Sequence, residues 1–239
     1  MSLIDPNLFK GESETGGGAP FASAYSSPRR GGAGFVDPRP LTAWVRVVLY
    51  IEAALLAVLL AGNLFNGDAL FMRGGLLDLT GKETTTQVIG AVLMTLVLLM
   101  VIVRGVLCLR WMWRANKNAH SLASMIETSP GWAWGAFFIP IWNLYKPFQT
   151  MSEIWRSAEN PTSWRGLSTP GILWLWWALW LGLSLFSRLP DALAGNRWAA
   201  VVAMVLHMAA WAGLDLLFAY MIDHVAKRQV EAHEDTVFD

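Results

Sequence analysis

The chain has 239 residues, of which 54% are hydrophobic and only 15% charged, and its mean hydropathy is +0.39. Because soluble domains carry about 25% charged residues, this composition argues against a soluble domain and predicts an integral membrane protein. The formal net charge is zero, which gives no support for a nucleic-acid partner, and the single cysteine, Cys108, excludes an internal disulfide and a cysteine-based metal site.

The first 40 residues are rich in glycine, serine and proline. They lack the apolar side chains that would offset the entropy cost of ordering the chain, so we expect a disordered tail over residues 1–40. The first long apolar run begins at Leu41 and is too long for the hydrophobic part of a signal peptide. We therefore expect no cleaved signal.

Four long apolar runs follow, at residues 44–65, 87–109, 171–189 and 198–222. Each has about 20 residues, roughly what an α-helix needs to cross ~30 Å of hydrocarbon. We predict an all-α membrane domain over residues 41–225 with four transmembrane helices. A polar loop at 66–86 and a short turn at 190–196 would join them in pairs, and a polar tail would occupy residues 226–239.

Residues 110–160, between the second and third predicted spans, hold six of the 14 tryptophans: Trp111, Trp113, Trp132, Trp134, Trp142 and Trp155. The second helix is expected to continue through Ile126. Ser129 and Pro130 are then suited to the N-cap and the first position of a new helix. Since tryptophan is enriched at membrane interfaces, we interpret these side chains as interfacial anchors.

The middle of this segment is apolar but interrupted by Pro140 and Asn143. We therefore expect a re-entrant or interfacial segment rather than a crossing. From Phe148 to Asn160, apolar residues at helical spacing predict an amphipathic helix on the membrane surface.

The orientation follows from the distribution of lysine and arginine. With the amino terminus inside and four crossings, the two outer loops contain only Arg73, Lys82, Arg188 and Arg197. The positive-inside rule then places both termini in the cytoplasm. If residues 131–151 crossed as well, giving five transmembrane helices, the charge bias would weaken, so we prefer four crossings and keep five as the alternative.

The central segment also carries a set of unusual residues at fixed spacing, including Trp-Arg-Ala-Asn-Lys-Asn at 113–118 and Ser-Pro-Gly-Trp at 129–132. The motif residues are Trp113, Arg114, Asn116, Asn118, Pro130, Gly131, Trp132, Pro140, Asn143, Pro147, Glu153, Trp155 and Arg156. In this pattern the chain resembles a bacterial membrane-protein family catalogued as domain of unknown function 4328, in which threonine is usual in place of Ser129. The resemblance implies a multi-span protein of the bacterial cytoplasmic (inner) membrane and brings no established activity.

Four ionisable residues stand out inside the predicted spans: Glu52, Arg104, His207 and Asp215. Glu52, Arg104 and Asp215 share a depth of about 9–12 Å above the inner boundary, at roughly 1.5 Å per residue, so a buried cluster is geometrically possible. The functional interpretation is a proton or ion relay or a polar ligand pocket. The structural interpretation, which we prefer because pairing alone explains the charges, is an ion pair that fixes helix register.

Polar residues of the central segment receive structural interpretations. Asn116, Asn118 and Asn143 are expected to cap backbone groups that Pro140 leaves free, because such groups must be satisfied inside the protein at membrane depth. We expect Glu153 and Arg156 to be solvated or paired on the surface helix.

Signals for an enzyme are poor. The four histidines lack metal-ligand spacing, and there is no phosphate-binding glycine loop. The stretch 182–185 weakly resembles an intramembrane serine-protease motif but lacks its final glycine. We therefore expect no cofactor or metal.

Two functions remain open. The first is a non-enzymatic helical bundle whose cytoplasmic interfacial layer binds lipid or a protein, either a membrane protein or a second copy of this chain. The alternative is a small transporter or channel that uses Glu52, Arg104, His207 and Asp215. It ranks second because the predicted span 171–189 offers no acidic group, whereas most helices of a pore contribute polar lining.

Overall fold

The computed structural model describes residues 34–66, 85–187 and 195–238. Most of the predicted tail, most of the predicted loop at 66–86 and most of the predicted turn at 190–196 lie outside these residues. The arginines and lysines predicted for those segments, such as Arg73, Lys82 and Arg188, lie outside them too.

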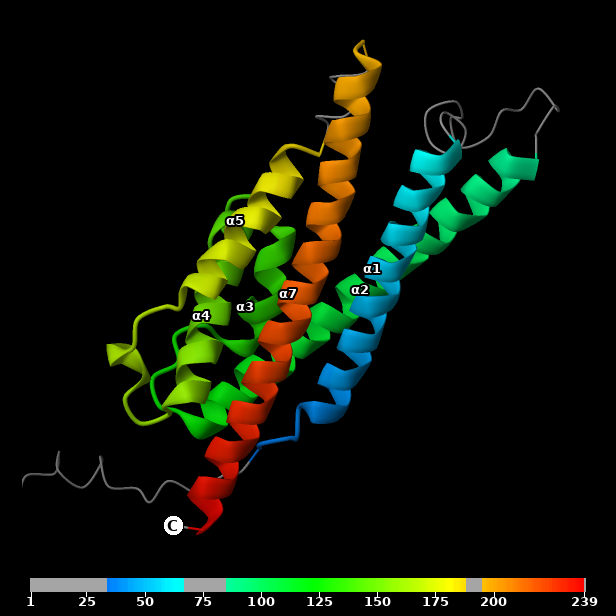
Figure 1. Ribbon diagram of the computed structural model, residues 1–239. Coiled ribbons are helices and arrows are strands. Elements are labelled where there is room, and N and C mark those ends of the chain that lie inside the picture. Colours follow the sequence, from blue (N-terminus) through cyan, green and yellow to red (C-terminus); the bar gives the residue numbers. More distant parts are fainter. Residues whose placement is uncertain (1–33, 67–84, 188–194, 239) are drawn as a thin grey trace, which may run out of the picture. The chain divides into compact units, whose positions relative to one another are not determined.

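The described part of the chain is all-helical and contains no strand, which confirms the predicted class (Figure 1). The four longest helices are α1 (Arg39–Asn66), α2 (Thr85–Leu122), α5 (Gly171–Leu185) and α7 (Arg197–Phe238). Five short elements lie between α2 and α5: α3 (Pro130–Gly135), η1 (Ala136–Phe138), η2 (Trp142–Leu144), α4 (Lys146–Glu159) and η3 (Trp164–Gly166). The restart at Pro130 agrees with the sequence prediction, whereas α2 ends at Leu122, before the predicted end at Ile126.

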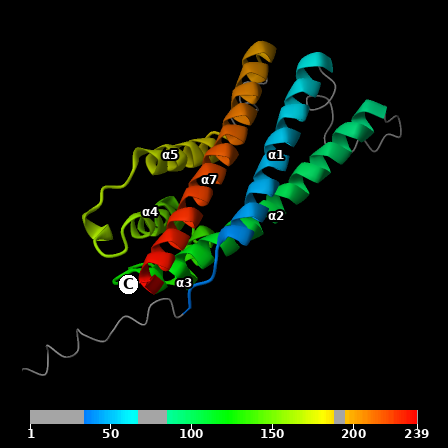
Figure 2. The ribbon, with the colours of Figure 1, turned by 60° about the horizontal axis from the view of Figure 1, so that its bottom comes forward.

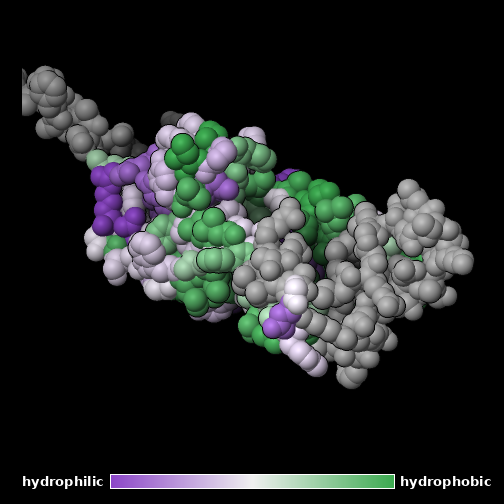
Figure 3. Space-filling view, turned by 90° about the horizontal axis from the view of Figure 1, so that it is seen from above, coloured by the Kyte–Doolittle hydropathy of each residue, from purple (hydrophilic) through white to green (hydrophobic). Residues whose placement is uncertain are grey.

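Three helical segments are long and apolar enough to cross a membrane: Arg39–Ala61, Ala91–Leu122 and Trp198–Val237. On the face shown in Figure 3, hydrophobic side chains cover much of the described surface and hydrophilic ones gather toward one edge. Helix α5 has 15 residues, so at roughly 1.5 Å per residue it spans only about 22 Å. It is shorter than the predicted span 171–189, whose last two residues lie outside the described part.

Helices α1 and α7 pack in antiparallel orientation, with α4 and α5 on the other side of α7 (Figures 1 and 2). Arg46 near the start of α1 forms an ion pair with Asp223 in the second half of α7. Trp111 on α2 donates a hydrogen bond from Nε1 to Thr42 Oγ1 at 2.8 Å. The start of α1, the second half of α2 and the carboxyl-terminal half of α7 therefore lie at the same end of the bundle.

The hydrophobic core gathers at this end. It draws on every long helix and on α4, with Leu49 from α1, Met112 from α2, Ile154 from α4, Leu173 from α5 and Ile222 from α7 all buried. Helix α4 thus completes the core between α2, α5 and α7. The core is where the predicted interfacial layer meets the predicted spans.

The carboxyl-terminal segment differs from the prediction. Residues 226–239 were expected to form a polar tail, but α7 continues as a helix to Phe238. The reason is that Val225, Ala226, Gln229 and Val230 are buried, and their spacing repeats every four residues on one helical face. Gln229 donates from Nε2 to the Ala115 carbonyl at 2.9 Å, which ties this extension to α2.

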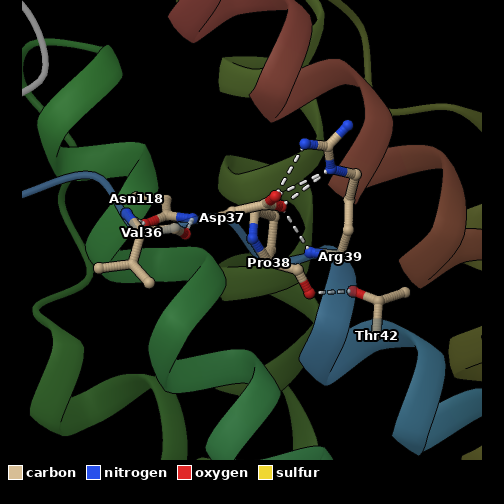
Figure 4. Close-up of polar contacts among 6 residues, drawn as sticks. All are labelled: Val36, Asp37, Pro38, Arg39, Thr42 and Asn118. Atoms are coloured by element: carbon tan, nitrogen blue, oxygen red, sulfur yellow. Dashed lines mark hydrogen bonds and ion pairs between the residues drawn. The ribbon is translucent and has the colours of Figure 1, made fainter.

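Helix α1 begins at Arg39, two residues before the predicted boundary at residue 41. Asp37 acts as a cap for α1, since its Oδ1 accepts a hydrogen bond at 2.9 Å from the N–H of Arg39, the first residue of the helix. Thr42 Oγ1 donates to the Pro38 carbonyl at 2.8 Å. Figure 4 shows these contacts beside Val36 and Asn118.

Candidate functional site

Three of the four ionisable residues in the predicted spans meet in the structure. Arg104 Nη1 on α2 lies 2.9 Å from Asp215 Oδ1 on α7 and 3.0 Å from Glu52 Oε1 on α1. Both carboxylate residues are only 3% exposed. We refer to Glu52, Arg104 and Asp215 as the ion cluster.

Helical spacing explains why these side chains point inward. Glu52 follows the buried Val45 and Leu49 on the inner face of α1, and Asp215 is adjacent to the buried Leu214 on α7. Residues three or four positions apart share a helix face. The apolar residues that drive packing therefore also bring the carboxylates inside.

The charges of the ion cluster do not balance. Two carboxylates face one guanidinium, so the cluster has a formal charge of −1 when both carboxylates are ionised. Glu52 Oε2 and Asp215 Oδ2 are buried and have no hydrogen-bond partner within the described part of the chain. Since an unpaired buried charge is costly, the cluster can accept one further positive charge or hydrogen-bond donor.

His207 lies outside the ion cluster, although it shares the face of α7 with Asp215. Its Nε2 accepts a hydrogen bond from Trp211 Nε1 at 3.0 Å. The Arg104 guanidinium carbon lies 5.5 Å from the centre of the Trp211 ring. His207 is two helical turns away from Asp215, so it lies outside the ion cluster. Trp211, between them on α7, connects the two.

A pocket of about 260 Å³ opens beside the ion cluster. Arg104 and Asp215 lie in its wall, and most of the remaining lining is apolar. Six aromatic residues contribute to it: Phe137, Phe138, Trp176, Trp180, Trp211 and Phe218. We refer to this site as the aromatic pocket.

Sequence reasoning missed the aromatic pocket. Trp176 of α5 stacks on Phe218 of α7 at 5.6 Å between ring centres. Phe137 meets Trp180 edge to face at 6.5 Å. These contacts join η1, α5 and α7, and no local sequence signal indicates such a meeting.

Glu153 lies inside the protein, not on a solvated helix face. Its Oε2 accepts a hydrogen bond from the Thr128 N–H at 2.9 Å, and its Oε1 accepts one from Gln149 Nε2 at 3.2 Å. Glu153 is 2% exposed and Ser152 4%. The prediction of a surface helix is therefore wrong for α4. Two connections cover the polar side of this helix: one contains Thr128, and the other contains Thr169, which is hydrogen-bonded to Ser152.

Arg156 is held on the same side of α4. Its Nη1 donates to the Leu167 carbonyl at 3.3 Å, and its guanidinium carbon lies 5.2 Å from the centre of the Trp164 ring. Trp164 Nε1 in turn donates to the Ser124 carbonyl at 3.0 Å. These contacts tie the connection after α4 to the connection after α2.

Asn118 binds the amino-terminal segment instead of capping the backbone near Pro140. Its Nδ2 donates to the Val36 carbonyl at 2.9 Å, and its Oδ1 accepts from the Val36 N–H at 3.2 Å (Figure 4). The capping role predicted for this residue is therefore wrong, because its position on α2 faces the start of α1 and the end of α7.

The other two asparagines are not seen to cap either. Asn116 is fully buried, and neither of its amide atoms has a partner among the described residues. Asn143 Oδ1 is likewise buried without one in the same part of the chain. The turn at Pro140 is bridged by the backbone instead, since the Asn143 N–H donates to the Ile139 carbonyl at 2.8 Å.

The remaining motif residues build short turns and ring contacts. Pro130 follows Ser129 at the start of α3, although the Ser129 side chain forms no capping hydrogen bond. Gly131 follows within the same helix, and Pro147 is the buried second residue of α4. Trp113 lies beneath two cations, with Arg114 Cζ at 5.4 Å and Lys117 Nζ at 5.3 Å from its ring centre.

Residues 130–145 present an exposed aromatic surface. Trp132 stacks on Trp142 at 5.0 Å between ring centres, and Trp142 also meets Tyr145 at 5.8 Å. The large exposed apolar residues of this surface are Trp132, Trp134, Phe138, Ile139, Ile141, Trp142, Leu144 and Tyr145. We refer to them together as the aromatic surface.

A second charged group lies between α4 and α7. Glu159 accepts hydrogen bonds from Arg228 Nη2 at 2.7 Å and from His224. His224 stacks on Trp155 at 4.3 Å between ring centres. Partial burial raises the pKa of the Glu159 carboxyl, but the hydrogen bonds from Arg228 and His224 outweigh it and hold that pKa below its usual value of 4.5.

Comparison with known proteins gives a family. The family model described as "Domain of unknown function (DUF4328)" matches residues 77–228, which is more than half of the chain. No curated protein and no solved structure matches. The matched range contains α2 to α5, every motif residue from Trp113 to Arg156, and the part of α7 that carries Asp215 and His224.

Proposed function

We propose a lipid-binding role in the membrane for this chain, which belongs to the family described as a domain of unknown function (DUF4328). The protein is a non-enzymatic integral protein of the bacterial cytoplasmic membrane, and its inner layer binds lipid. The inner layer comprises residues 110–160. Its lipid-binding part is the aromatic surface of residues 130–145. The single observation that carries this proposal is the exposure of that surface in a chain whose described part has three helices long and apolar enough to cross a membrane.

Four crossings with both termini in the cytoplasm fit the packing of the helices. An even number of crossings returns the chain to the side from which it started. The Arg46–Asp223 ion pair joins the start of α1 to the second half of α7, as this arrangement requires. With five crossings these two ends would lie on opposite sides of the membrane, so the ion pair favours four.

Helix α5 serves as the short crossing. It runs antiparallel to α7, since Trp176 pairs with Phe218 and Trp180 lines the same pocket as Trp211. Its direction carries the chain from the inner layer toward the start of α7 at Arg197.

The chemistry of the aromatic surface favours lipid over water. Tryptophan and tyrosine are enriched at the boundary between headgroups and hydrocarbon, where their rings are buried and their polar atoms stay wet. Ile141 is 74% exposed and Phe138 66%, which is costly in water at about 25 cal/mol per Å² of apolar area. Entry of residues 130–145 into the inner leaflet from the cytoplasmic side removes this cost.

Lipid contact can be tested with a fluorescent probe at Ile141→Cys in a Cys108→Ala background. In vesicles, lipids with nitroxide-labelled chains should quench this probe, and aqueous iodide should not. The matched control is Ser163→Cys, an exposed polar position in the same part of the chain, which iodide should quench. Equal iodide quenching at both positions would refute the proposal, and a probe at Ile141 shielded from both quenchers would replace lipid with a protein partner.

A second candidate function is transport of a small ion, which the unbalanced charge of the ion cluster favours. Purified protein in liposomes would then show a flux that Asp215→Asn and Glu52→Gln reduce. Asp223→Asn is the control, because Asp223 pairs with Arg46 and Lys227 away from the cluster. No flux, or equal flux in all variants, would remove this candidate.

A further inference from the structure

We infer that the aromatic pocket is a binding site for a lipophilic organic cation, with Asp215 as its counter-ion. The pocket shares Phe138 with the lipid-binding surface, and its occupation by a cation requires neither transport nor enzymatic activity. It rests on three features of the pocket: the arrangement of its rings, the charge of its wall and a glycine that leaves space open.

The rings supply the affinity for a cation. Six of the residues that line the pocket are aromatic, and five elements, α1, α2, η1, α5 and α7, contribute to its wall. The face of an aromatic ring carries partial negative charge and attracts a cation, most strongly where water is excluded. Arg104 already uses this attraction at Trp211, while the rings of Trp176 and Trp180 contact no cation among the described residues.

The charge of the wall determines the sign of the ligand. Arg104 is engaged by both carboxylates through the same Nη1 atom, so it is already neutralised and offers little to an anion. Asp215 lines the pocket and is 3% exposed, and its Oδ2 has no partner among the described residues. A monovalent cation in the pocket beside Asp215 would bring the ion cluster to neutrality, which favours binding strongly in a medium of low dielectric constant.

A lipid acyl chain explains the site less well. A hydrocarbon chain would fill the apolar part of the pocket but leave Asp215 Oδ2 without a partner and the cluster with its net charge. A flexible chain also makes no particular use of flat rings, whereas a compact cation with methyl or aryl groups contacts several ring faces at once. The acyl chain is therefore the competing occupant that the experiment must reject.

Gly105 gives a means of blocking the pocket without changing its charge. It lies in the wall on α2, and a Cβ atom at this position would meet no other atom within 4 Å. A larger side chain here enters the pocket, and replacing glycine inside a helix raises helix propensity. Gly105→Leu should therefore fold as well as the wild type and fill the site.

The test uses the purified full-length protein in nanodiscs and two probes of the same shape. Benzyltrimethylammonium is the cation, and neopentylbenzene is its neutral counterpart with carbon in place of nitrogen. Binding is measured by calorimetry and by quenching of tryptophan fluorescence. We expect saturable binding of the cation with a Kd at least about tenfold lower than that of the neutral probe.

The variants separate charge from shape. Asp215→Asn should raise the Kd of the cation by about tenfold or more and leave that of the neutral probe nearly unchanged. Asp223→Asn, on the same helix but outside the pocket, should change neither. Gly105→Leu should abolish binding of both probes, and it decides the location of the site even if Asp215→Asn fails to fold.

Several results would overturn the inference. Equal affinity for both probes would indicate a purely apolar site, as expected for an acyl chain. Unchanged cation binding in Gly105→Leu would place the binding elsewhere, and equal losses in Asp215→Asn and Asp223→Asn would indicate a general effect of charge. Absence of saturable cation binding by the wild type would refute the site outright. None of these results bears on lipid contact at Ile141, so the two proposals stand or fall separately.

Discussion

Arg104 Nη1 lies 2.9 Å from Asp215 Oδ1, although the two residues are 111 positions apart in the chain. The same nitrogen lies 3.0 Å from Glu52 Oε1. This one guanidinium therefore links α1, α2 and α7, the three helices that are long and apolar enough to cross a membrane. Its removal should have consequences for the whole bundle.

Replacing Arg104 by methionine should destabilise the protein by about 3–5 kcal/mol, because it leaves two buried carboxylates without their shared cation. Thermal unfolding in detergent measures the change. The triple variant Glu52→Leu, Arg104→Met, Asp215→Leu removes all three charges and should recover most of the loss, since apolar replacement of a buried ion cluster is often neutral or stabilising. If the triple variant is as unstable as Arg104→Met, the charges are not the cause.

The pairing of Asn118 with Val36 yields a more local prediction. Asn118→Ala removes both hydrogen bonds to the Val36 backbone and the one to Gln229, which should cost about 1–3 kcal/mol because buried polar groups lose their partners. Hydrogen exchange at the Val36 amide should become faster, whereas exchange in the middle of α5 should not change. Asn160→Ala, which removes hydrogen bonds in an exposed turn, is the control and should leave the Val36 amide protected.

The helices could be predicted from the sequence because their signals are local. Long apolar runs and four-residue spacing follow from helix geometry alone, and the Ser129-Pro130 start of α3 follows from the preferences of the first helical turn. Equal depth along their helices allowed Glu52, Arg104 and Asp215 to be considered as one group. In α7 the same four-residue spacing extends through Val225 and Gln229. A prediction based on this spacing, rather than on the polarity of residues 226–239, would have extended the helix into that segment.

The aromatic pocket and the burial of α4 could not be predicted in this way. Phe137 and Trp180 are 43 positions apart in sequence numbering, and only tertiary packing brings their rings together. Glu153 is polar and lies on the polar face of α4, so helical periodicity alone suggests exposure. Its burial depends on the Thr128 N–H, which needs an acceptor, and that requirement is visible only once the connection after α2 is in place.

The hydrogen bonds at Glu159 predict a dependence of stability on pH. Because Arg228 and His224 lower the pKa of this carboxyl below its unfolded value, its contribution is fully present above about pH 4.5 and is lost as the pH falls through the lowered pKa. Glu159→Gln should therefore be less stable than the wild type at pH 7, by on the order of 1 kcal/mol given partial exposure. The two proteins should become equally stable at acid pH, as measured by urea or thermal unfolding.

The control for this prediction is Glu127→Gln, whose carboxylate pairs with Arg165 at 3.5 Å on the surface. Exposed pairs contribute little, so its stability should follow that of the wild type across the same pH range. A constant difference between Glu159→Gln and the wild type at every pH would show that the Glu159 charge is not responsible.

The orientation of the protein can be decided by cysteine labelling in intact cells. In a Cys108→Ala background, Gly195→Cys, Ser163→Cys and Asp235→Cys place single thiols at exposed positions. With four crossings and the termini inside, an impermeant maleimide should label Gly195→Cys directly, and the other two only after permeabilisation. Five crossings with the amino terminus inside predict the reverse for all three, because residues 131–151 would then carry every later segment to the opposite side. Labelling therefore separates the two arrangements without relying on activity, and it also decides whether the aromatic surface faces the inner leaflet.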